Sequence, residues 1–422
     1  MRKFLLSLLI MISIHSNAQT DSGFAKIPIV FIHGFLASGD TWSNAFHFFQ
    51  LEGYRANQLF VFDWNSISGA NKQTDTLLIK FIDAVLQKTG AAQVDLVGHS
   101  AGGGLARNLL KDSLQARKIA HYAHIGSRKW TTAYPWFPNT KCINIYSAGD
   151  KVAGNSAGRI EGATNVMLGL EDHYQVATSN EALHPIKEFF AGRYILCFEN
   201  SIPPVEIAGK AVVLGTNQPM SGATLRVYPL NKKNGKRKSA ASGGRLTVDE
   251  NGHWGPVTVE RQTPYEIEIV PANQQGRVIS YYFPSFFESD PLVYLRGFPN
   301  DSRMNFLLGK IPENESSTTL VLYASTGAMV GGRDSVTVNG MQVCSPILTP
   351  ASKTAITSFI FDDGDGISSG NALKQFSSVP FISGVDMALP ADKKPIHIYF
   401  NGKQLTIPAL PSAERIQLAV FR

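Results

Sequence analysis

The pentapeptide Gly98-His99-Ser100-Ala101-Gly102 is the part of the sequence best suited to covalent chemistry. It directly follows an apolar run, 94–97, that is typical of a buried strand, and it directly precedes a stretch with helical spacing. A serine at such a strand–turn–helix junction projects its hydroxyl from a tight turn, and flanking glycines let strand and helix approach closely. The pattern therefore predicts Ser100 as a nucleophile.

Attack on a carbonyl group also needs hydrogen-bond donors for the negative charge that develops on its oxygen. His33-Gly34-Phe35 ends the first strong strand-like run, 29–32, and Ala101 begins the helical stretch after the serine. We expect the backbone N–H groups of Phe35 and Ala101 to form an oxyanion hole, next to the positive end of the helix dipole. The simpler alternative is that Gly34 only permits a turn.

A serine nucleophile needs a base, and the base needs an acid that orients it. Asp150 follows the strand-like run 142–147, and His173 lies between the last strand-like run and the final helical stretch. Loops at the carboxyl ends of parallel strands are where such sheets place active sites. We therefore predict Asp150 as the acid and His173 as the base. The weaker candidates are Asp112, Asp172, His99, His121, His124 and His184.

To bring the predicted nucleophile, acid and base together, the chain must form a sheet of mostly parallel strands covered by helices. Short β-branched runs alternate with helical stretches up to about residue 190, which predicts an α/β fold. The expected strands are 27–32, 58–63, 93–97, 118–125, 142–147 and 165–168, and the expected helices are 74–89, 101–114 and 180–190.

Beyond about residue 200 the pattern changes to short alternating strands separated by Gly, Pro, Asn and Asp turns, which predicts an all-β sandwich or barrel. We expect a catalytic domain at 19–200 and an all-β region at 201–422, with a possible break near 284–290. The expected strands include 210–214, 223–228, 265–270, 278–283, 318–323, 355–361 and 395–400.

The N-terminus and the composition bear on location and partners. Arg2 and Lys3 precede a short apolar run and small residues ending at Ala18, which predicts a signal peptide at 1–18 and a secreted protein without a transmembrane anchor. The net charge of +6 is concentrated in the stretch 231–244, which we interpret as a solvated hairpin loop, so no nucleic-acid partner is expected. Three cysteines allow at most one disulfide bridge.

The stretch 29–192 resembles the small secreted bacterial lipases with a minimal α/β-hydrolase core. The resemblance is carried by Val30-Phe31-Ile32-His33-Gly34-Phe35, Val94-Asp95-Leu96-Val97-Gly98-His99-Ser100 and Ile143-Asn144-Ile145-Tyr146-Ser147. It implies the triad Ser100, Asp150 and His173 and an oxyanion hole at Phe35 and Ala101, although family members often carry Met where this chain has Ala101. The whole chain is similar, more loosely, to two-domain lipases and carboxylesterases with a β-rich C-terminal domain.

The predicted function is hydrolysis of lipid esters such as acylglycerols, with transient contact at a lipid interface and no cofactor or metal. Trp130, Trp136 and Phe137 could wall a substrate groove, or they could pack on the core. The acidic run 362–366 has the composition of a calcium loop but lacks its full pattern, so a turn is expected there. A polyesterase, or a surface-binding protein with a secondary hydrolase domain, remains an alternative.

Overall fold

The computed structural model describes residues 26–191, 204–272, 277–298 and 311–422. The predicted signal peptide, Cys197 and the predicted domain boundary at residues 200 and 201 lie outside the described residues. Within the described ranges, every helix is too short or too polar to span a bilayer.

The N-terminal half contains a six-stranded parallel sheet in the order β2-β1-β3-β4-β5-β6, which confirms the predicted α/β fold. In this sheet β2 lies on one side of β1 and β3 lies on the other. The order in which the chain adds strands therefore reverses between β1 and β3. A ligand crevice forms at such a switch point. The strands are β1 (Ile29–Ile32), β2 (Leu59–Phe62), β3 (Val94–His99), β4 (Ile119–Ile125), β5 (Cys142–Ser147) and β6 (Thr164–Leu168).

Helices cover both faces of this sheet. Ile29 and Phe31 of β1 belong to a core with α1 and α6, whereas Val30 and Ile32 belong to a core with α2 and α3. Alternate residues of a strand point to opposite faces, so a strand buried on both sides reads as a continuous apolar run. The helices are α1 (Ser43–Leu51), α2 (Lys72–Thr89), α3 (Ala101–Leu109), α4 (Ser113–Ala116), α5 (Gln175–Thr178) and α6 (Asn180–Ala191).

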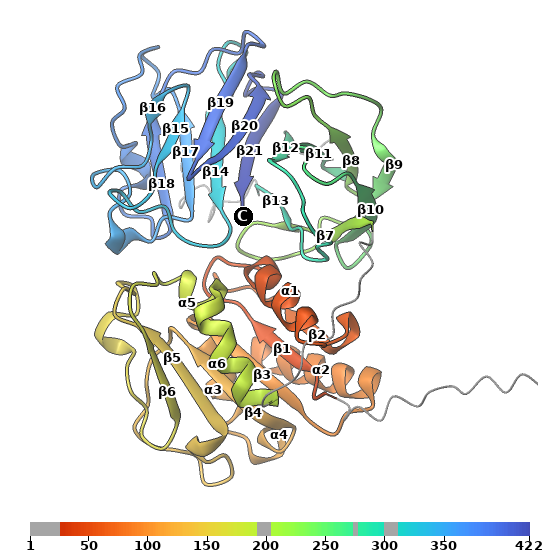
Figure 1. Ribbon diagram of the computed structural model, residues 1–422, viewed down its shortest axis with the longest axis vertical. Coiled ribbons are helices and arrows are strands. Elements are labelled where there is room, and N and C mark those ends of the chain that lie inside the picture. The colour runs from red at the N-terminus through yellow and green to blue at the C-terminus, as the bar shows by residue number, and fades with distance from the viewer. Residues whose placement is uncertain (1–25, 192–203, 273–276, 299–310) are drawn as a thin grey trace, which may run out of the picture.

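The C-terminal part is built from three sheets, which confirms the predicted β-rich region (Figure 1). An eight-stranded sheet, β18-β17-β14-β21-β12-β11-β8-β9, lies between the sheets β10-β7-β13 and β16-β15-β19-β20, with one hydrophobic core on each of its faces. This sheet joins strands from both sides of residues 284–290, so the two parts of the β region share one sheet.

The strands of the β region are β7 (Val205–Val213), β8 (Thr224–Pro229), β9 (Ser242–Thr247), β10 (His253–Val259), β11 (Tyr265–Val270), β12 (Val278–Phe283), β13 (Leu295–Gly297), β14 (Leu320–Ala324), β15 (Val336–Val338), β16 (Met341–Gln342), β17 (Thr357–Phe361), β18 (Ile382–Asp386), β19 (Pro395–Phe400), β20 (Lys403–Pro408) and β21 (Arg415–Phe421). The run 231–244 connects β8 to β9 through mostly exposed residues, and Arg237 ties it to the sheet by ion pairs with Glu266 and Glu268.

The β region is stacked directly on the catalytic half (Figure 1). Val212, Leu292 and Tyr294 of the β region are buried in the same hydrophobic core as α1 and α6. The guanidinium group of Arg296 forms a buried ion pair with Asp40. Buried apolar contacts and paired charges of this kind show that the β region is packed on the catalytic half and is not a flexible appendage.

Candidate active site

Ser100 lies between the end of β3 and the start of α3 with φ 52° and ψ −119°, a conformation that costs energy for a residue other than glycine. Its neighbours explain why glycine is needed on both sides. A Cβ on Gly98 would come within 2.8 Å of the Gly102 carbonyl oxygen, and a Cβ on Gly102 would come within 2.5 Å of the Ile32 carbonyl oxygen. The turn is therefore held in a strained shape by close backbone contacts.

The structure brings Ser100, His173 and Asp150 together. The Ser100 hydroxyl lies 2.9 Å from Nε2 of His173 and donates to it, and Nδ1 of His173 donates to Oδ2 of Asp150 over 2.8 Å. Asp150 follows β5 and His173 follows β6, so both reach Ser100 from the carboxyl end of the sheet. The side chains of Asp150 and His173 are buried, whereas Ser100 is partly exposed.

The surroundings of Asp150 keep its carboxylate ionised. Burial alone would raise its pKa, but the hydrogen bond and the charge of His173 outweigh burial, and the pKa of Asp150 is lowered from its usual value. Its other oxygen accepts the backbone N–H groups of Val152 and Ala153, each over 2.9 Å. An ionised acid with both oxygens bonded holds the imidazole in one tautomer, with the Nε2 lone pair facing the serine.

The two predicted oxyanion donors belong to residues near Ser100, one of them in space and the other in the chain. Phe35 lines a small cavity with Ser100, and Ala101 is the first residue of α3. Within the part of the chain that the structure describes, the Phe35 N–H donates to no protein acceptor. The cavity offers only about 20 Å³, enough for a water molecule, so a substrate acyl group has to displace its walls. The lining residues are Gly34, Phe35, Ala37, His99, Ser100, His173, Tyr174, Thr354, Ile356 and Phe381.

Three of these lining residues, Thr354, Ile356 and Phe381, come from the β region, and the sequence analysis missed them. The Phe381 ring lies nearly parallel to the His173 ring, with centroids 6.1 Å apart. Thr354 and Phe381 both have positive φ values, 48° and 66°. Strained backbone of this kind is concentrated at functional sites. No local pattern in the sequence distinguishes these residues, because only the contact between the two parts places them beside Ser100.

His99, one of the weaker base candidates, contacts the main chain of His173. It is buried, and its Nε2 donates to the backbone carbonyl of His173 over 2.8 Å. Burial lowers the pKa of His99 to about 3, with a smaller contribution from His173, so the ring stays neutral. The neutral ring fixes the main chain that carries the base. Its place between Gly98 and Ser100 was the signal available in the sequence.

Trp130, Trp136 and Phe137, which we call the aromatic loop, are not among the residues that line this cavity. Of the two alternatives for these residues, the structure corrects the groove wall in favour of packing on the core. Trp130 stacks on Tyr122, and the Arg107 guanidinium lies 4.3 Å from its ring centre. Trp136 donates to the Leu110 carbonyl over 2.9 Å, and Phe137 is buried in the core formed by α2 and α3. Stacking and cation–π contacts hold the loop on the α3 side of the sheet, away from the residues that line the Ser100 cavity.

The weaker acid and base candidates are used elsewhere. Asp112 caps α4, and Asp172 accepts the N–H groups of Tyr174 and Gln175 and pairs with Arg333 of the β region. His184 packs edge-on against Phe48. The remaining two histidines bind neighbouring side chains: His121 contacts Asp95, and His124 contacts the Tyr122 hydroxyl.

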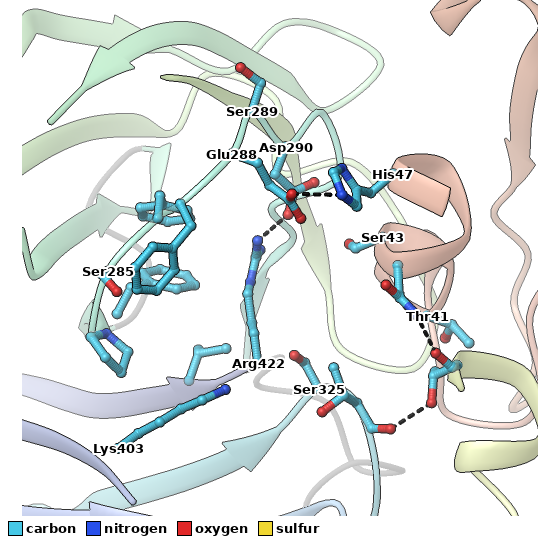
Figure 2. Close-up of a pocket in the computed structure, with 18 residues that line it drawn as sticks. Thr41, Ser43, His47, Ser285, Glu288, Ser289, Asp290, Ser325, Lys403 and Arg422 are labelled. Atoms are coloured by element: carbon cyan, nitrogen blue, oxygen red, sulfur yellow. Dashed lines mark hydrogen bonds and ion pairs between the residues drawn. The ribbon is translucent and has the colours of Figure 1, made fainter. Parts of the chain in front are cut away.

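A larger cavity of about 280 Å³ lies at the seam between the two parts (Figure 2). Figure 2 shows Thr41, Ser43 and His47 on one side and residues of the β region on the other, with His47 paired to Glu288 over 2.8 Å. Ser100 does not line this cavity. The pair of His47 and Glu288 crosses the seam, whereas Arg422 pairs with Asp290 within the β region.

The acidic run 362–366 forms a turn. Carboxylate oxygens of Asp362, Asp363 and Asp365 lie within 4.8 Å of one another, and the Asp362 carboxylate accepts the Gly366 N–H over 3.0 Å. Such a hydrogen bond closes a turn of the type expected there.

A hydroxyl, imidazole and carboxylate in this order can activate the serine for attack on a carbonyl carbon. Comparison with known families agrees with this chemistry. Residues 26–118 match the family model of class 2 lipases, and residues 203–298 match the lipase C-terminal domain model. The chain is an ester hydrolase of the α/β-hydrolase superfamily. In this hydrolase, residues 322–421 match a further model, described as a C-terminal domain.

Solved structures similar to the hydrolase include enzymes of this fold. A lipase from Bacillus licheniformis, BlEst2, shares 18% identity over 39% of this chain and 91% of its own, with a TM-score of 0.30. A CIB-like hydrolase from Thermoplasma acidophilum shares 16% identity over 40% and 87%, with a TM-score of 0.31. Aspergillus fumigatus lipase B shares 13% identity over 37% and 50%, with a TM-score of 0.29.

Proposed function

We propose that the hydrolase cleaves carboxylic esters through an acyl-enzyme on Ser100. Ser100 Oγ attacks the ester carbonyl carbon as its proton passes to His173 Nε2, and the N–H groups of Phe35 and Ala101 hold the oxyanion. Collapse of the tetrahedral intermediate breaks the bond between the acyl carbon and the alkoxy oxygen, and His173 protonates the leaving alcohol. A water molecule, deprotonated by His173, then releases the acid and restores Ser100. The observation that carries this proposal is the unbroken hydrogen-bond chain Ser100–His173–Asp150.

We further propose that the substrates are lipid esters such as acylglycerols. We also propose that the protein is secreted. The lipase family models that match both parts of the chain support the substrate class. The charged and apolar start of the sequence supports secretion. Apolar residues of the Ser100 cavity, among them Ile356 and Phe381, suit a hydrocarbon chain once the cavity has widened.

Covalent trapping tests the nucleophile directly. We expect a fluorophosphonate to inactivate the full-length protein with one equivalent attached, and peptide mass spectrometry to find the label on Ser100. A glycerol ester series of increasing acyl length, assayed in solution and as emulsion, tests the substrate class. A label on another residue would refute the mechanism, and turnover limited to water-soluble esters would refute the lipid substrate.

The pH dependence follows from the charges in the relay. The general base must be unprotonated to accept the serine proton, so kcat/KM should fall on the acid side of the profile. Asp150 has a lowered pKa and stays ionised over this range. The loss of kcat/KM at acidic pH should therefore follow the binding of a single proton. A pH–rate profile of p-nitrophenyl butyrate hydrolysis measures this. A kcat/KM that does not change with pH, or one that falls in proportion to the square of the proton concentration, would contradict this expectation.

The polyesterase alternative needs an open groove, but the cavity around Ser100 is small, and Thr354, Ile356 and Phe381 are among its walls. No observation therefore favours it. The surface-binding alternative treats the hydrolase domain as secondary. It fits poorly with a β region that contributes three residues to the cavity around the nucleophile.

A further inference from the structure

Asn217 of the β region inserts its side chain into the loop that carries the proposed oxyanion donor. It lies between β7 and β8, is buried, and has φ 56°. Its Nδ2 lies 3.0 Å from the carbonyl oxygens of Ala37 and Trp64 and 3.2 Å from Nε2 of His33. Its Oδ1 accepts the Ser38 hydroxyl over 2.5 Å. One amide thus contacts four residues of the catalytic half.

These contacts determine the tautomer of His33. Two carbonyl oxygens require the NH₂ side of the Asn217 amide, which fixes its orientation. The Trp64 backbone N–H also points at His33 Nε2, over 3.2 Å. Nε2 therefore carries a lone pair, and Nδ1 carries the proton and donates to the Gly34 carbonyl over 2.8 Å. Burial lowers the pKa of His33, so the ring stays neutral.

The contacts of Asn217 also hold the loop 33–39 in place. Two of its backbone N–H groups are anchored in the catalytic half, because Leu36 donates to Ser66 and Gly39 donates to Asp63, each over 2.9 Å. Asn217 adds the anchor on the Ala37 carbonyl, two residues after Phe35. Phe35 itself lines the cavity that contains Ser100.

We propose that Asn217 is a positioning residue of the oxyanion hole, acting through His33 and the Ala37 carbonyl without touching the substrate. This inference rests on the proposed function. It makes the β region part of the catalytic apparatus, because the loop is not fully held by the catalytic half alone. Loss of one oxyanion donor lowers kcat by about 10²–10³-fold. Displacing the donor should cost less, about 10–50-fold in kcat, with KM changed little.

The test uses full-length protein, p-nitrophenyl butyrate as substrate and a trifluoromethyl ketone as transition-state analogue. Asn217→Gly removes the amide, and glycine tolerates the positive φ. We expect kcat to fall about 10–50-fold at similar KM, and affinity for the ketone to fall by the same factor as kcat/KM. The matched control is Asn339→Gly, the same change at φ 48° in an exposed turn of another sheet, which should leave kcat within twofold.

Asn217→Asp separates hydrogen bonding from space filling. It keeps the shape of the side chain but turns an oxygen toward the carbonyls of Ala37 and Trp64, so its loss of kcat should at least equal that of Asn217→Gly. Wild-type kcat in either variant would overturn the inference. If neither variant folds, Ser38→Ala tests the same contact from the catalytic half: a threefold or larger loss of kcat at unchanged KM supports the inference, and an unchanged kcat overturns it.

The proposed function can fail separately. Turnover that persists in Ser100→Ala would overturn the serine mechanism. Turnover that depends on Ser100 but is indifferent to both substitutions of Asn217 would overturn only the role of Asn217.

Discussion

Replacing Ser100 with alanine should lower kcat for p-nitrophenyl butyrate by about 10⁵–10⁶-fold while the protein stays folded. Without the hydroxyl, His173 Nε2 has no nucleophile to deprotonate, and an acyl-enzyme cannot form. The oxyanion donors and the binding site remain, so a small residual rate above the uncatalysed reaction is expected. Removing the hydroxyl does not relieve the backbone strain at residue 100, because the close backbone contacts of Gly98 and Gly102 impose the φ of 52°.

The measurement is steady-state hydrolysis at neutral pH, with circular dichroism and the thermal midpoint to verify folding. Ser113→Ala, at the first residue of α4, is the matched control and should keep wild-type kcat. A Ser100→Ala protein that retains more than about one hundredth of the wild-type rate would contradict the proposed nucleophile, once contaminating esterase has been excluded with the fluorophosphonate.

Replacing Asp150 with asparagine should lower kcat by about 10⁴-fold. The amide occupies the same space, but its nitrogen can face Nδ1 of His173 and stabilise the tautomer whose lone pair points away from Ser100. It also lacks the charge that stabilises the imidazolium during proton transfer. The two backbone N–H groups of Val152 and Ala153 favour an oxygen at one position, which leaves the nitrogen toward His173.

Asp112→Asn is the control for this change. Asp112 caps α4 through the N–H groups of Leu114 and Gln115, and asparagine caps a helix about equally well. Its kcat and its stability should therefore match the wild type. A loss in Asp150→Asn of less than tenfold, in a folded protein, would show that another group orients His173.

Much of the fold could be predicted from local patterns. Each expected strand of the parallel sheet corresponds to an observed one, because strands buried on both faces are apolar throughout and are bounded by turns. The long helical stretch after Ser100 is interrupted, since α3 ends at Leu109 and Asp112 caps the next helix, α4. The strands that were not among the expected ones are β9, β10, β13, β15, β16, β18, β20 and β21. Exposed or short strands such as β9 and β16 bury too little apolar surface to leave a clear pattern.

The positions of Ser100, Asp150 and His173 could be proposed from sequence because chain order and strand ends constrain them. A nucleophile must follow a strand and precede a helix, and its partners must follow later strands of the same sheet. The aromatic loop shows the limit of such reasoning. Trp130 is near the site in the chain, but its direction depends on Arg107 and Tyr122, which lie on other elements.

The amino-acid sequence by itself determined the catalytic half, the residue types of the relay and the change to β structure after about residue 200. Each of these depends on short-range properties: turn chemistry, periodic burial and the spacing between strand ends. Only the tertiary structure decided that Phe381, Thr354 and Asn217 reach the site from the other part of the chain. Contacts between residues so distant in the chain arise from how two finished surfaces fit, and no local pattern encodes that fit.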